Sequence, residues 1–153
     1  MKPRKPRPQP LPAAAALTEA DHHRLVVQDL TETICRLRPD GTFTYVNEVY
    51  CRLFGKTSTE LIGSRWQPVA VAEDLPMIEE KLRTLTPQNP VVVIENRVYD
   101  GQGQVRWMQF VNRGLFDASG RLVEMQAVGR DITERVLTEQ KLKESQQRWR
   151  FAL

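Results

Sequence analysis

The feature of this sequence that most restricts its fold is a pair of apolar runs that are joined by a tight turn and lead directly into a charged helical segment. The runs are Val105–Phe116 and residues 122–129, and the turn between them is Asp117-Ala118-Ser119-Gly120. Because Asp and Gly favour chain reversals, the pattern predicts a β-hairpin. Residues 130–135 follow without a break, so we expect a strand of the sheet to connect directly to an outgoing helix.

Turn residues of the same kind predict a second hairpin near the start of the chain. Residues 34–37 and 42–46 are strand-like, and Arg38-Pro39-Asp40-Gly41 lies between them. Asn47 follows the second strand, where its side chain can cap a helix over Glu48–Phe54. The early hairpin is therefore expected to lead into a helix.

The middle of the sequence predicts further helices and then a strand. Thr57-Ser58-Thr59-Glu60 has the pattern of a capping box for a short helix that Gly63 would stop. Apolar residues recur at helical spacing over residues 75–85, with Asp74 as the expected N-cap, and residues 91–99 are rich in β-branched side chains. Five strands with helices clustered after the second indicate an α+β fold, in which an antiparallel sheet carries helices on one face.

Length and charge indicate one domain with an extension at each end. A chain of 153 residues can bury a core without disulfides or metals. Residues 1–16 are rich in proline and carry four of the 22 basic residues and no acid, which predicts a disordered leader. The remaining 18 basic and 19 acidic residues nearly balance, which argues against a nucleic-acid partner. We expect a helix over residues 17–32, the folded domain over 33–131 and a helical linker over 132–153.

The outgoing segment has the composition of a long helix. Residues 132–153 contain no glycine or proline, and Asp131 is the expected N-cap. A heptad fit to this segment has only two large apolar members, Leu142 and Trp149. Such a weak seam fits a signalling helix whose packing must change, or a helix that packs on its own domain.

The cysteines and the hydropathy indicate where the chain would reside. Cys35 and Cys51 form no C-x-x-C motif, which argues against a metal or redox site and favours a reduced, cytoplasmic setting. No apolar run approaches the roughly 20 residues of a membrane span. His22 and His23 lie in the leading segment, away from the motifs, and are expected on the surface.

The sequence offers little for catalysis. Asp131 and Glu95 are carboxylates that a general base would require, but each has a structural explanation. Asp131 can cap the outgoing helix, and Glu95 can pair with a neighbouring strand charge such as Arg97. We therefore expect a domain without enzymatic activity.

Several short motifs of the late hairpin resemble, in type and order, the C-terminal half of a PAS domain. They are Asp100-Gly101, Arg106-Trp107, Asp117-x-x-Gly120 and Arg130-Asp131-Ile132-Thr133-Glu134-Arg135. The early hairpin, Asn47 and the short helices resemble the N-terminal half, so the resemblance covers residues 25–135. It implies a five-stranded antiparallel sheet with short helices on one face and a C-terminal signalling helix.

The resemblance also implies a sensor or interaction module of a signalling protein, such as one of a bacterial two-component system. Asp131, Ile132 and Thr133 would relay a change to the helix and then to a downstream output domain, typically a histidine kinase or a cyclic-dinucleotide synthase. Residues 144–153 resemble the segment that opens a further PAS repeat. A homodimer is the expected assembly.

The two best-known cofactors of the family do not fit the residues. Cys51 and Arg52 resemble part of the motif of flavin photoreceptors, but Tyr50 precedes the cysteine and the pair lies on the helix that begins at Asn47. A haem branch would require an axial histidine within residues 75–85, where there is none. The resemblance therefore implies neither haem nor covalent flavin, and it names no other cofactor.

A small ligand without a covalent bond would occupy the space between the sheet and the helices. Small residues of the last strand, Ala127 and Gly129, would leave room there. The residues expected to contact the ligand are Asn47, Leu53, Phe54, Trp66, Ile78, Leu82, Arg97, Trp107, Met125 and Ala127. The apolar members of this set would equally well fill the core of a ligand-free domain.

Two functions follow from these alternatives. In the first, a ligand binds the module and shifts the last strand and the outgoing helix. In the second, a ligand-free module pairs two chains through the outer face of the sheet, where Val128 and Ile132 are expected, and sets the register of their helices.

Overall fold

A computed structural model describes residues 17–29 and 31–152, and the chain divides into the units Met1–Leu30 and Thr31–Leu153. In the first unit, helix α1 spans Glu19–Asp29. The hydroxyl of Thr18 accepts a hydrogen bond from the backbone N–H of Asp21 at 3.1 Å, and this contact caps the start of the helix. The predicted leader over residues 1–16 lies outside the described residues.

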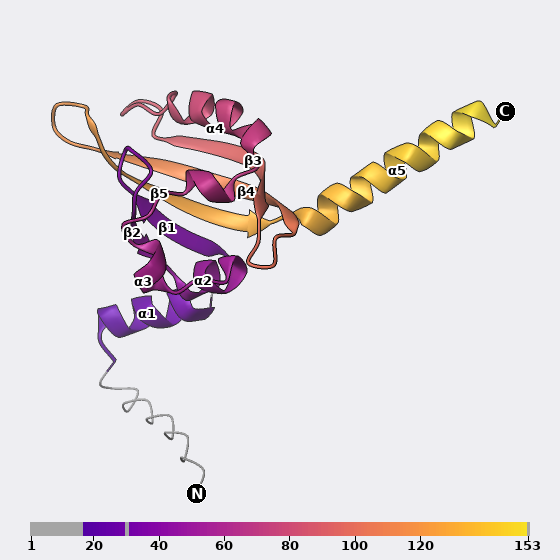
Figure 1. Cartoon of the computed structure of the whole chain (residues 1–153). Coiled ribbons are helices and arrows are strands. Elements are labelled where there is room, and N and C mark those ends of the chain that lie inside the picture. Colours follow the sequence, from indigo (N-terminus) through magenta and orange to yellow (C-terminus); the bar gives the residue numbers. More distant parts are fainter. Residues whose placement is uncertain (1–16, 30, 153) are drawn as a thin grey trace, which may run out of the picture. The chain divides into compact units, whose positions relative to one another are not determined.

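The second unit is built on a five-stranded sheet, shown in Figure 1. Its strands are β1 (Thr33–Leu37), β2 (Phe43–Val46), β3 (Val91–Tyr99), β4 (Val105–Phe116) and β5 (Leu122–Asp131). They are ordered β2-β1-β5-β4-β3, and every neighbouring pair is antiparallel. The last strand in sequence is therefore the central strand of the sheet, paired with β1 on one side and with β4 on the other.

The helical segments between β2 and β3 pack on one face of this sheet, as the sequence predicted (Figure 1). They are α2 (Glu48–Phe54), α3 (Ser58–Leu61), the 3-10 turns η2 (Gln67–Val69) and η3 (Ala72–Asp74), and α4 (Leu75–Leu82). The helix α5 (Thr133–Phe151) follows β5. The predicted α+β fold is confirmed. Among the described residues, no helix is both long and apolar enough to cross a membrane.

Local capping chemistry fixes the connection from the early hairpin to α2. The side-chain oxygen of Asn47 accepts hydrogen bonds at 3.0 Å from the backbone N–H groups of Tyr50 and Ile34, so one amide caps the helix and holds it to β1. Gly55 ends the helix with a φ of 64°, in the left-handed region that favours glycine. Glycine is also required for packing here, because a Cβ on Gly101 would lie 2.8 Å from backbone atoms of Gly55.

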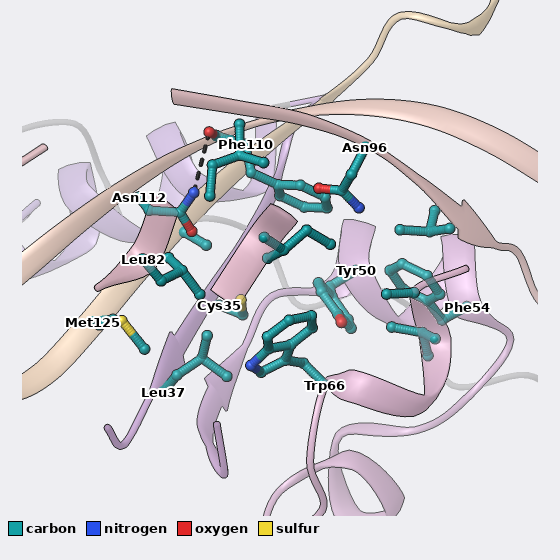
Figure 2. Close-up of a pocket in the computed structure, with 16 residues that line it drawn as sticks. Cys35, Leu37, Tyr50, Phe54, Trp66, Leu82, Asn96, Phe110, Asn112 and Met125 are labelled. Atoms are coloured by element: carbon teal, nitrogen blue, oxygen red, sulfur yellow. Dashed lines mark hydrogen bonds between the residues drawn. The ribbon is translucent and has the colours of Figure 1, made fainter. Parts of the chain in front are cut away.

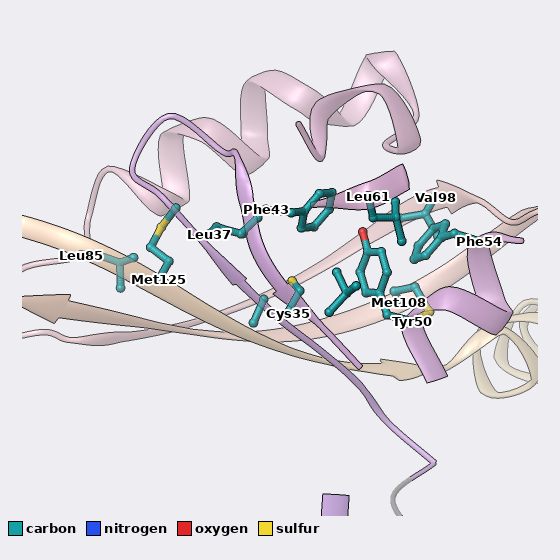
Figure 3. Close-up of a cluster of buried hydrophobic side chains, with 12 residues drawn as sticks. Cys35, Leu37, Phe43, Tyr50, Phe54, Leu61, Leu85, Val98, Met108 and Met125 are labelled. Carbon is teal, nitrogen blue, oxygen red and sulfur yellow. The ribbon is translucent and has the colours of Figure 1, made fainter. Parts of the chain in front are cut away.

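The core lies between the helices and the inner face of the sheet (Figure 3). Phe43 and Tyr50 meet edge to face with ring centroids 5.3 Å apart, and Tyr50 lies 4.5 Å from Phe54. Aromatic pairs in this geometry contribute about 0.5–1.5 kcal/mol beyond the burial of their area. This aromatic cluster attaches α2 to the hairpin of β1 and β2.

Asp74 and Glu95 differ from the sequence expectation. Asp74 does not cap α4 with its side chain, because its carboxylate accepts hydrogen bonds from the Arg97 side chain at 2.7 and 3.1 Å and from the Arg97 backbone N–H at 2.8 Å. Glu95 pairs with Arg135 of α5 at 2.8 Å and not with Arg97. Both acidic residues thus bind basic partners that are distant in sequence.

The end of β5 also differs from the expectation. The strand continues to Asp131, and the N-cap position of α5 is Ile132, which makes no capping contact through its side chain. Ile132 is only 5% exposed, so the prediction that it lies on the outer face of the sheet is wrong. Its burial follows from its position at the junction, where its backbone N–H donates to the carbonyl of Trp107 at 2.9 Å.

Candidate functional site

A cavity of about 50 Å³ lies between the inner face of the sheet and the helices (Figure 2). Its walls come from all three kinds of segment: strands, α-helices and the 3-10 turn η2. Six of the residues predicted to contact a ligand line it: Phe54, Trp66, Ile78, Leu82, Met125 and Ala127. The structure therefore brings together residues that are up to 73 positions apart in sequence, while ligand binding itself stays a prediction.

The central strand forms part of the wall of the cavity through Met125 and Ala127. In the sheet register Ala127 lies between Asn112 of β4 and Cys35 of β1, and all three residues line the cavity. Gly129 does not widen the cavity as expected. The space beside it is filled, because a Cβ there would lie 2.6 Å from the ring of Phe110.

The other four predicted contact residues lie outside the cavity. Asn47 is buried and its amide caps α2. Leu53 packs at the edge of the core, and its carbonyl accepts the backbone N–H of Gly101. Arg97 and Trp107 are opposite each other in the register of β3 and β4, and the guanidinium lies 5.7 Å from the indole ring. These two alternate with the buried Asn96, Val98 and Met108, so they point to the outer face.

The polar residues of the cavity were missed by the sequence analysis. Asn96 and Asn112 line it from β3 and β4 and are only 3% and 7% exposed. A pattern in the sequence could have indicated Asn96, because it alternates with Ile94 and Val98 on a strand whose inner face is apolar. An asparagine in that position is either bonded to the backbone or available to a ligand.

The titratable groups of the cavity are neutral at physiological pH. Burial raises the pKa of the Cys35 thiol to about 12, against a smaller opposing effect from a hydrogen bond to the Ala127 backbone. Burial also raises the pKa of Tyr50 well above its ordinary value. The residues that line the cavity include no Asp, Glu, Lys, Arg or His. Within 17–29 and 31–152, no cluster of three or more His, Cys, Asp and Glu side chains could hold a metal ion.

A groove on the surface adjoins the cavity. It has a volume of about 300 Å³ and is lined by Pro39, Trp66, Gln67, Glu79, Leu82, Arg83, Leu122 and Met125. Trp66, Leu82 and Met125 line both the groove and the cavity, so these three residues lie where the two spaces meet.

The junction between β5 and α5 is held by a small set of hydrogen bonds. The carboxylate of Asp131 accepts from the backbone N–H and the hydroxyl of Thr133, at 2.9 and 2.6 Å. The Thr133 hydroxyl in turn accepts the backbone N–H of Trp107 at 2.9 Å. The first turn of α5 is thereby bonded to β4 as well as to the strand that it follows.

A buried carboxylate at the turn from β3 to β4 extends this network. Burial raises the pKa of Asp100, but hydrogen bonds from Arg106 and from the backbone N–H groups of Gln104 and Gln102 outweigh it, so the pKa is lowered overall. Arg106 donates to Asp100 at 3.0 Å and its guanidinium also lies 3.6 Å from Asp131. The turn and the start of α5 therefore share one arginine.

Comparison with known proteins finds a curated protein whose amino-acid sequence is similar to that of this chain. Over 122 residues the chain is 33% identical to the two-component sensor PprA of Pseudomonas aeruginosa, a match that covers 79% of this chain and 13% of that protein. The chain thus spans about an eighth of the length of this curated relative.

Solved structures share the fold. A PAS domain from Colwellia psychrerythraea superposes with a TM-score of 0.67 at 16% identity, covering 75% of this chain and 98% of that one. A sensory box histidine kinase/response regulator structure from Burkholderia thailandensis gives 0.69 at 21% identity, covering 84% and 98%.

The sequence profile of one family accounts for most of the chain. The profile, described as the PAS fold, matches residues 27–137. This range includes all five strands, the segments that enclose the cavity and the start of α5. The expectation drawn from the hairpin motifs is confirmed, and the chain belongs to the PAS family.

Proposed function

We propose that this chain is the sensory module of a larger cytoplasmic signalling protein, and that a small ligand in the cavity controls its outgoing helix. Asp131, Ile132 and Thr133 would relay the change to α5 and then to an output domain, such as a histidine kinase or a cyclic-dinucleotide enzyme. The module itself would catalyse no reaction. The similarity to a two-component sensor supports this context.

One observation carries the proposal: the same strand lines the cavity and leads into the helix. Met125 and Ala127 of β5 line the cavity, and the strand ends at Asp131, four residues beyond Ala127. A ligand that displaces these side chains therefore acts on the strand that positions α5. Such a ligand shifts the helix only if it binds two arrangements of the junction with different affinities.

The substitution Ala127→Phe tests this function by filling the cavity. Val123→Phe is the matched control, because Val123 lies on the same strand and is 55% exposed. Native mass spectrometry of the purified chains should show a bound mass on the wild type and the control but not on Ala127→Phe. Removal of that ligand should change hydrogen exchange in α5. A bound mass that persists in Ala127→Phe, or exchange in α5 that is the same with and without ligand, would contradict the proposal.

A second function, dimerisation without a ligand, is favoured by an apolar row on the outer face of the sheet. Val93, Val111, Val128 and Ile34 are successive neighbours across β3, β4, β5 and β1. Val93 and Val111 are 49% and 36% exposed. A second copy that covered this row would remove apolar surface from water and set the register of two outgoing helices.

The substitution Val111→Lys separates the two functions. It should convert a dimer to a monomer in sedimentation experiments if the row is the interface, because a charge would be buried at its centre. Val105→Lys is the control, since Val105 is also exposed but lies at the beginning of β4, outside the row. A dimer that survives Val111→Lys would argue against this interface.

A further inference from the structure

We propose that the cavity selects an uncharged, largely apolar ligand that donates hydrogen bonds, with the side-chain oxygens of Asn96 and Asn112 as its anchors. This inference rests on the proposed function, because it assigns a ligand class to the same cavity. It is carried by the charge of the walls, by the orientation of the two amides and by their spacing.

The walls provide no partner for a charge. The residues that line the cavity carry no ionisable side chain that is charged at neutral pH. Nearby, a guanidinium nitrogen of Arg97 lies 2.7 Å from a carboxylate oxygen of Asp74, so the two charges pair with each other. Arg97 also points to the outer face of the sheet. A carboxylate or ammonium ligand would lose its hydration without gaining an opposite charge, which strongly disfavours its burial.

Hydrogen bonds to the backbone determine which end of each amide a ligand meets. Asn96 Nδ2 donates to the carbonyl of Arg97 at 3.2 Å, and Asn112 Nδ2 donates to the carbonyl of Phe110 at 3.2 Å (Figure 2 shows the latter). A flipped amide would place two acceptor oxygens against each other, so the orientation is fixed. Within the described part of the chain, neither Oδ1 accepts a hydrogen bond from the protein, so each oxygen is available to a donor group of a ligand.

The spacing of the two amides indicates the shape of the ligand. Asn96 is opposite Met108 and Asn112 is opposite Val92, so the two amides lie four residues apart on the inner face. This corresponds to about 13 Å along the strands. Ile94 and Phe110 face each other between them and also line the cavity. Because the cavity has a volume of only about 50 Å³, a ligand is expected to place an O–H or N–H group against one of the two amides and an apolar body beside Ile94 and Phe110.

Three probes of one carbon skeleton test the assignment: butan-1-ol, butanoate and butylammonium. Each is titrated into the full chain of 153 residues, while NMR follows the side-chain amide resonances of Asn96 and Asn112 and the methyl resonance of Met125. Only butan-1-ol should produce saturable shifts. Asn112→Leu and Asn96→Leu keep the size of the side chain and remove the acceptor, and at least one should weaken binding by about three- to tenfold. Gln109→Leu on the outer face of β4 should bind like the wild type.

The outcomes separate the ligand class from the function. Saturable shifts with butanoate or butylammonium but not butan-1-ol would overturn the ligand class and leave the cavity as a binding site. Binding of butan-1-ol that is unaffected in both folded asparagine variants would also overturn the role of the amides. If none of the three probes perturbs the cavity resonances of the wild type, the ligand class fails, whereas the proposed function is decided separately by the bound mass in native mass spectrometry. The dispersion of the backbone spectrum shows that each variant is folded.

Discussion

Two neighbouring small residues of the central strand have different effects on the interior. Ala127 lines the cavity, whereas the space beside Gly129 is occupied by the ring of Phe110 and the hydroxyl of Thr33. Both residues belong to the same face of β5. At the scale of the residue, then, a small side chain creates a cavity only where no larger neighbour crosses over it.

The substitution Gly129→Ala should destabilise the protein by about 1–3 kcal/mol, because the added methyl group overlaps Phe110 and Thr33. Urea unfolding measures the change. Phe110→Leu makes room for the methyl group, so the double variant should be more stable than the sum of the two single effects predicts. Strict additivity of the two changes would contradict this packing.

At the scale of elements, the ion pair of Asp74 and Arg97 links the start of α4 to β3. The Arg97 hydrogen bonds are the largest effect on the Asp74 carboxyl, and they lower its pKa below the ordinary value of 3.8. The folded protein therefore favours the ionised carboxylate. The resulting stabilisation is fully present above the ordinary pKa and is lost as the pH falls through the lowered, folded-state pKa.

The substitution Asp74→Asn should reduce the free energy of unfolding at pH 7 by about 1–3 kcal/mol, the range for hydrogen bonds to charged groups. The difference from the wild type should shrink as the pH falls below about 4, because the carboxyl of the unfolded chain is protonated there while the folded carboxyl, with its lowered pKa, is still ionised. Urea unfolding at several pH values measures both effects. Glu73→Gln is the control, because Glu73 is exposed and adjacent. A difference that is constant from pH 7 to 3 would argue against the ion pair as its cause.

The junction of α5 makes a second prediction at this scale. Thr133→Val removes the acceptor of the Trp107 N–H and the donor to Asp131, so the first turn of α5 should open more easily, by about 1 kcal/mol. Hydrogen exchange of residues 133–137 measures this opening. Thr138→Val changes an exposed threonine of the same helix and should leave those amides unaffected. Equal exchange in both variants would show that the Thr133 contacts do not hold the helix.

Across the whole molecule, the sequence predicted what local chemistry determines. Asn47 could be assigned as a cap from the residues beside it, and the strand β3 was found with its observed bounds, because caps and alternation depend on near neighbours. Asp74 was assigned to the wrong partner because Arg97 lies 23 residues away and reaches it only through the fold.

The cavity was predictable in part, because some of its wall residues belong to local sequence patterns. Its apolar wall residues follow from periodicity and from the resemblance to a family. Alternation along the strand could have placed Asn96 on the inner face, but only the register shows that Asn112 lies on the same face and that both amide nitrogens are bonded to carbonyls. Register depends on pairing across strands, and that information is absent from a single run of residues.

The central position of β5 also determines when the domain can form during synthesis. Thr33 bonds to Gly129, 96 residues further along the chain, so β1 has no neighbour on that side until nearly the whole domain has been made. At about 5–20 residues per second, the first hairpin waits roughly 5–20 s on the ribosome. The apolar surface that β5 later covers stays exposed for that time, which makes the nascent domain prone to aggregation. The residues added next are those of α5, so the outgoing helix is made directly after the strand that completes the sheet.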